Sequence, residues 1–83
     1  MEENVNVKEV YANSLTVVNT FFDFCLSFKK DNIISEDEEQ KTITEEVARI
    51  RMSPQMAKAF SLLLQNNIQN YEQQFGEIPE IRR

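Results

Sequence analysis

The stretch VARIRMSPQMAKAFSLLLQNNIQNYEQQFG, residues 47 to 76, contains a change of hydrophobic period that sets the fold class. Before Ser53, apolar and charged residues alternate, which is typical of a half-buried strand. After Pro54, apolar residues recur at helical spacing as far as Gly76. Serine can cap the free N–H groups of a first helical turn, proline fits the first helical position, and glycine suits a C-terminal cap. The stretch therefore predicts a strand that passes directly into a helix at about 54–75.

A second apolar strip lies in FFDFCLSF, residues 21 to 28, where every second residue is aromatic or aliphatic. This period of two predicts another half-buried strand. Residues 5–19 are rich in β-branched side chains and predict one more strand or a short strand pair. The acidic segment 31–41 has a composition that can bury little, so we expect a hydrated, mobile loop there.

Together these patterns predict a single α+β domain over residues 1–83. Its parts are a small antiparallel sheet of three to four strands within about 5–52, one long C-terminal helix packed on one face of the sheet, and a short tail at 76–83. The helix is expected to cover the strip of Phe24, Leu26 and Phe28. The helix residues expected against this strip are Phe60, Leu64, Ile68 and Tyr71.

Charge and reactive side chains disfavour several classes of function. The chain has 83 residues, a net charge of −5, no histidine and one cysteine, Cys25. The negative charge disfavours nucleic-acid binding, and no run approaches the ~20 apolar residues of a membrane span. A Cys/His zinc site, a phosphate-binding glycine loop and a histidine base are all missing. We therefore expect no cofactor, no metal and no enzymatic activity, and a cytoplasmic protein in which Cys25 is a reduced, structural residue.

Three motifs give the chain a family resemblance: VYAN at 10–13, DFCLSF at 23–28 and the stretch 47–79. With them the chain resembles the small bacterial and phage proteins grouped as domain-of-unknown-function family 3467. The resemblance implies a β-rich N-terminal half followed by one long helix, and it carries no established activity. Where this sequence has Phe21 and Phe22, the family commonly has a turn proline and a small polar residue. The two phenylalanines are therefore expected at a bend, with the strand beginning near Asp23.

Phe21 and Phe22 lead to the first functional hypothesis. They either pack under the helix or form part of a contact with another chain, because two aromatic rings left in water would make an unusual apolar patch. A sheet covered by one helix also has a second face, which a copy of the chain can cover. We therefore expect a non-enzymatic interaction or adaptor module that acts as a homodimer or larger oligomer. A small chaperone-like holdase is an alternative by analogy of fold.

Lys29, Arg49 and Arg51 lead to the second hypothesis, a protein that binds or sequesters a small anionic ligand such as a nucleotide. The two arginines share one face of their strand, and guanidinium groups match phosphate geometry. Antiparallel pairing of the two strands offers a purely structural explanation, in which Asp23 lies opposite Arg49 and neutralises it. Both explanations remain open from the sequence.

Overall fold

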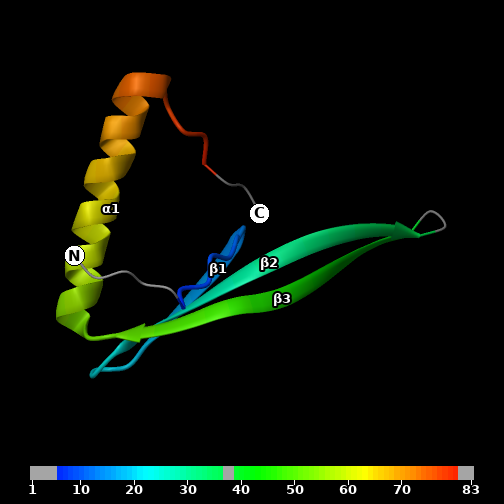
Figure 1. Ribbon diagram of the computed structural model, residues 1–83, viewed down its shortest axis with the longest axis horizontal. Coiled ribbons are helices and arrows are strands. Elements are labelled where there is room, and N and C mark those ends of the chain that lie inside the picture. The colour runs from blue at the N-terminus through cyan, green and yellow to red at the C-terminus, as the bar shows by residue number, and fades with distance from the viewer. Residues whose placement is uncertain (1–5, 37–38, 81–83) are drawn as a thin grey trace.

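The computed structural model describes residues 6–36 and 39–80 and contains one sheet and one helix within them (Figure 1). The elements are β1 (Ser14–Asn19), β2 (Phe24–Glu36), β3 (Glu39–Met52) and α1 (Pro54–Phe75). The strands form an antiparallel sheet in the order β1-β2-β3. The predicted fold class, an α+β chain with a small antiparallel sheet followed by one C-terminal helix, is confirmed. The sheet begins later than predicted, because the described residues before Ser14 contain no strand.

β2 is the central strand, and its pairing sorts the side chains onto two faces. Leu26 pairs with Ile50 in β3 and with Val17 in β1. Because side chains alternate along a strand, residues paired in this way share a face. What we term the apolar sheet face consists of Leu15, Val17, Phe24, Leu26, Phe28, Ala48, Ile50 and Met52. Leu26, at its centre, is 6% exposed and is the one buried hydrophobic residue in the described part of the chain.

The prediction of a loop at 31–41 is wrong wherever the structure describes that segment. β2 and β3 stay paired to their ends, so the segment forms part of both strands of a long hairpin that extends beyond β1 (Figure 1). Ladder hydrogen bonds join backbone groups, so polar side chains do not prevent them. Thr44 also donates a hydrogen bond to Asp31 Oδ1 across the strands at 2.8 Å. Residues 37–38 lie outside the described residues, and the mobility of the segment stays a prediction.

Both predicted ends of α1 are confirmed. Ser53 Oγ accepts a hydrogen bond from Met56 N at 3.1 Å, and Pro54 occupies the first helical position. At the other end, Gly76 has a φ of 102°, a conformation that residues with a Cβ rarely adopt. The Gly76 N–H donates to the carbonyl of Glu72 at 2.9 Å. The cap and the glycine therefore set the length of the helix.

The predicted packing of α1 on the sheet is wrong for the single chain. The helix leaves the end of β3 and points away from the sheet (Figure 1). Leu64, Ile68 and Tyr71 of its predicted packing face are 46%, 39% and 50% exposed, and Phe60 alone of that face is half-buried. The reason is the length of the connection. Ser53 is the one residue between β3 and α1, and a single extended residue of about 3.5 Å cannot reverse the chain.

Ser53→Ala should destabilise the helix by about 0.5–2 kcal/mol, because alanine cannot accept the hydrogen bond that caps the first turn. Helical circular dichroism during thermal unfolding measures the effect as a lower Tm. Ser61→Ala is the matched control, since Ser61 is exposed within the helix, where alanine has the higher helix propensity. Equal stability of the two variants would contradict the role of the cap.

Candidate functional site

The turn between β1 and β2 presents two phenylalanines to solvent. Thr20 N donates to the Asp23 carbonyl at 2.9 Å, and Thr20 Oγ1 accepts from the backbone N–H groups of Phe22 at 3.1 Å and Asp23 at 3.2 Å. Phe21 and Phe22 are 89% and 80% exposed, and their rings meet edge to face with centroids 5.3 Å apart. The predicted bend is confirmed, and β2 begins at Phe24. Packing of the two rings under α1 is wrong for the single chain, because both rings are open to solvent.

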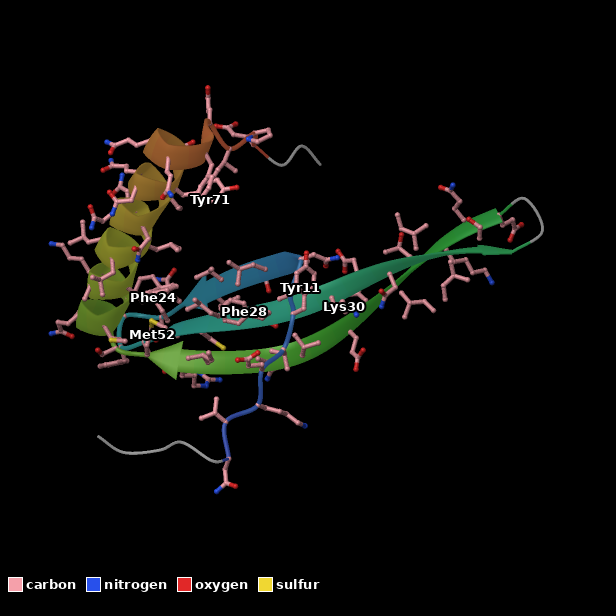
Figure 2. The ribbon with its side chains drawn as sticks, turned by 45° about the horizontal axis from the view of Figure 1, so that its top comes forward. Tyr11, Phe24, Phe28, Lys30, Met52 and Tyr71 are labelled. Carbon is pink, nitrogen blue, oxygen red and sulfur yellow. The ribbon has the colours of Figure 1, made fainter. Side chains whose placement is uncertain are left out.

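This turn lies at the end of the sheet where α1 begins. Phe24, directly after the turn, pairs with Met52, the last residue of β3. Figure 2 shows Phe24 and Met52 near the base of the helix. Met56, in the first turns of α1, is 55% exposed. A partner bound at this end of the sheet would therefore meet the Phe21–Phe22 pair and the start of the helix together.

The three candidate anion-binding residues share the face of the sheet opposite the apolar sheet face. The charges of the two arginines are already paired. Arg49 Nη2 lies 2.8 Å from Glu46 Oε1, and Arg51 Nη1 lies 3.5 Å from Asp23 Oδ2. Antiparallel strand pairing is confirmed, but the expected position of Asp23 opposite Arg49 is wrong, because Asp23 reaches Arg51 instead. Anion binding by Lys29, Arg49 and Arg51 stays a prediction.

A β-bulge explains how Glu46 reaches Arg49. The register between β2 and β3 skips Val47, which is therefore one extra residue on β3. In a regular strand, residues three positions apart point to opposite faces. The extra residue turns Glu46 to the side of Arg49, where Glu46 also accepts a hydrogen bond from Ser27 Oγ.

These contacts change the acidity of Glu46. The hydrogen bond from Ser27, followed by that from Arg49, lowers the pKa of the Glu46 carboxyl below its usual value. The same carboxylate raises the pKa of Arg49. Glu46 is therefore ionised at neutral pH, so it holds the arginine in place and is not poised to transfer protons.

The largest unpaired feature of the surface is apolar. The apolar helix stripe on α1 consists of Met56, Phe60, Leu63, Leu64, Ile68, Tyr71 and Phe75. Leu63 and Phe75 are 65% and 67% exposed, and the ring centroids of Tyr71 and Phe75 lie 4.9 Å apart. On the apolar sheet face, Val17 and Ile50 are 52% and 47% exposed. The single chain therefore carries two open apolar surfaces on separate elements.

The accessible surface area of the whole chain agrees with these open apolar surfaces. The chain exposes 8076 Å², whereas a compact monomer of 9.8 kDa exposes about 5,200 Å². Its radius of gyration is 16.5 Å, against about 12 Å for a compact domain of 83 residues. Hydrophobic residues make up 41% of the sequence, an ordinary share for a globular protein. The apolar side chains of a core are present, but the single chain does not bury them.

The sequence reasoning did not identify the apolar helix stripe and the apolar sheet face as surfaces left open to a partner. The composition of α1 held one signal. Lys58 and Glu72 are the charged residues of this 22-residue helix, whereas charged residues make up 28% of the whole chain. A helix with one side in water normally carries charges on that side. Uncharged Gln, Asn and Ser residues take the polar positions of α1 instead, and sparse charge is typical of the centres of protein interfaces.

The described residues contain no group of three His, Cys, Asp or Glu side chains that could hold a metal ion. The thiol of Cys25 is free and half-buried. Within the same residues, no helix is long and apolar enough to cross a membrane.

Ser27→Ala should raise the pKa of Glu46 toward its usual value, because alanine cannot donate the hydrogen bond that stabilises the carboxylate. The carboxyl carbon shift of Glu46 in an NMR pH titration measures this. A lowered folded-state pKa means that the stabilisation is present above the unfolded pKa and is lost as pH falls through the folded pKa. Ser35→Ala is the control, since Ser35 is exposed farther along β2. Unchanged titration of Glu46 in the Ser27→Ala variant would exclude the hydrogen bond.

Comparison with known proteins identifies the family of the chain. No curated protein and no solved structure matches the chain. The family model described as protein of unknown function (DUF3467) matches residues 2–80, in agreement with the resemblance carried by the sequence motifs. Because this match spans nearly all of the sequence, the chain belongs to the DUF3467 family.

Proposed function

We propose that the protein is a non-enzymatic interaction or adaptor module that acts as a homo-oligomer. The observation that carries the proposal is the accessible surface of 8076 Å², roughly 2,900 Å² more than a compact monomer of this mass exposes. Monomeric soluble proteins rarely expose contiguous apolar patches larger than a few hundred Å². This excess of total surface, together with exposed apolar side chains such as Val17, Leu63 and Phe75, supports a role in which another protein chain covers the surface.

A second copy of the chain is the partner we propose first. Short chains with little core commonly gain stability by oligomerisation, and two-fold dimers are the commonest symmetric assemblies. The Phe21–Phe22 pair supports a contact between chains, because its two rings are held outward by the hydrogen-bonded turn at Thr20. Aromatic residues in such positions are enriched at protein interfaces.

Binding of other proteins is the second part of this proposal. An adaptor or a chaperone-like holdase needs apolar area that a client segment can cover, and the parts of the two open apolar surfaces that a second copy leaves uncovered would supply it. We place this activity in the cytoplasm of a bacterium or a phage-infected bacterium, where the free thiol of Cys25 stays reduced.

Small-ligand binding is the weaker alternative. Arg49 and Arg51 already face carboxylates at 2.8 and 3.5 Å, so a nucleotide phosphate would have to displace Glu46 and Asp23. This competition weighs against the cationic residues as a ready anion site and favours their role as structural ion pairs, Arg49 within β3 and Arg51 with Asp23.

Changing Phe21 to Ser and Phe22 to Asp together should weaken self-association. Full burial of a phenylalanine is worth about 1.5–3 kcal/mol, so loss of both rings should raise the dissociation constant by at least about tenfold. Light scattering across a dilution series measures the mass.

Ile33→Ser is the matched control for this test. Ile33 is 70% exposed but lies on the part of the hairpin far from the turn, so its loss should leave the mass unchanged. A wild-type protein that is monomeric at every concentration contradicts the homo-oligomer. A double variant that stays fully assembled would show that the contact between chains lies away from the turn.

A further inference from the structure

We propose that α1 of one protomer packs its apolar helix stripe across the apolar sheet face of a second copy, and that the second copy returns the same contact, giving an interlocked two-fold dimer. This arrangement rests on the proposed homo-oligomer and specifies how its chains meet. Three features carry it: the connection at Ser53, the similar lengths of the middle of the helix stripe and the sheet face, and the area that the chain leaves open.

The connection at Ser53 keeps the apolar helix stripe away from the apolar sheet face of the same chain. Within one chain, α1 cannot fold back onto the sheet, because one extended residue joins β3 to the helix. Each chain therefore has an apolar helix without a sheet and an apolar sheet face without a helix. A two-fold contact is reciprocal by symmetry, so a single arrangement covers both surfaces in both chains.

The middle of the apolar helix stripe is close in length to the apolar sheet face. From Phe60 to Tyr71 the apolar helix stripe extends about 17 Å, at 1.5 Å per residue. From Phe24 to Phe28 the apolar sheet face extends about 13 Å along β2. The outer two strands lie about 10 Å apart, close to the diameter of one helix. Figure 2 shows Phe24 and Phe28 along β2, the strand that such a helix would cross.

The open area is that of an obligate dimer. Each chain exceeds a compact monomer by roughly 2,900 Å², so two chains together leave about 5,800 Å² open, at the upper end of obligate homodimer interfaces, which run from about 2,000 to 5,000 Å² and more for both chains together. The sparse charge of α1 agrees with burial, because charged residues are depleted at the centre of interfaces. Contact through the turn at Phe21 and Phe22 alone would leave most of this area open.

Two simpler dimers leave an apolar surface exposed. Pairing of helix against helix would cover the stripes but leave the sheet faces around Ile50 open. Pairing of sheet against sheet would cover those faces but leave Leu64 and Phe75 in water. The exchanged arrangement covers both surfaces, which is why we choose it.

Isotope-filtered NMR on the wild-type protein tests the arrangement. Isotopically labelled and unlabelled chains are unfolded together, refolded as mixed dimers and examined for NOEs that occur only between chains. We expect such NOEs from the methyl groups of Leu64 and Ile68 to the rings of Phe24 and Phe28. Inter-chain NOEs confined to helix and helix, or to sheet and sheet, overturn the exchanged arrangement.

Mass measured on the same sample separates the two possible failures. A dimer with the wrong NOEs rejects the exchanged arrangement but leaves the homo-oligomer standing. A monomer at every concentration rejects both. A dimer with the expected helix-to-sheet NOEs supports both.

Variants on each surface provide an independent test of the exchanged arrangement. Leu64→Glu on the helix and Ile50→Lys on the sheet should each raise the dissociation constant about 30-fold or more, because each puts a charge into the buried contact. The matched controls, Gln65→Glu and Thr16→Lys, lie off the two apolar surfaces and should stay within about threefold of the wild type. Weakening by Leu64→Glu alone indicates helix pairing, and weakening by Ile50→Lys alone indicates sheet pairing. Either result overturns the exchange.

Discussion

Ser53 alone joins β3 to α1, and its extended backbone directs the helix away from the sheet. This one connection decides what the single chain can bury. The sheet keeps one buried hydrophobic residue among those described, Leu26, and the helix keeps its apolar stripe in water. Hydrophobic burial is the dominant favourable term in folding, so in the assembly that we propose most of that term comes from association. In obligate homodimers, stability and protomer concentration cannot be separated for this reason.

The features predicted from the sequence are those set by neighbouring residues. The helix ends follow from Ser53, Pro54 and Gly76, each of which acts on backbone groups within one turn. The bend at Phe21 and Phe22 is also local, because Thr20 closes it with hydrogen bonds to Phe22 and Asp23. Alternation predicted the beginning of β2 and the end of β3, where one side of each strand is apolar.

The features that could not be predicted from the sequence depend on residues that are far apart in the chain. Asp31 and Thr44 pair across a hairpin whose composition suggests a loop, and only the opposite strand makes that segment regular. The bulge at Val47 turns Glu46 toward Arg49, and Asp23, just before β2, meets Arg51. For the candidate site, the residue types were evident but their partners were not. The amphipathic pattern of α1 predicted that its apolar side would be covered, but such a pattern carries no information about which chain provides the cover.

The edges of the sheet bear on how copies can meet. β3 is an edge strand of 14 residues, and an open edge of this length can pair with another chain. Its charged residues are Glu39, Lys41, Glu45, Glu46, Arg49 and Arg51. Charged side chains and bulges are the devices by which natural sheets disfavour edge-to-edge pairing, and β3 has both, with the bulge at Val47. Association through the edge is therefore opposed by Glu46, Arg49 and Arg51, which also form the ion pairs of the sheet. The apolar sheet face and the apolar helix stripe lack such protection, so the association that we propose uses these two faces.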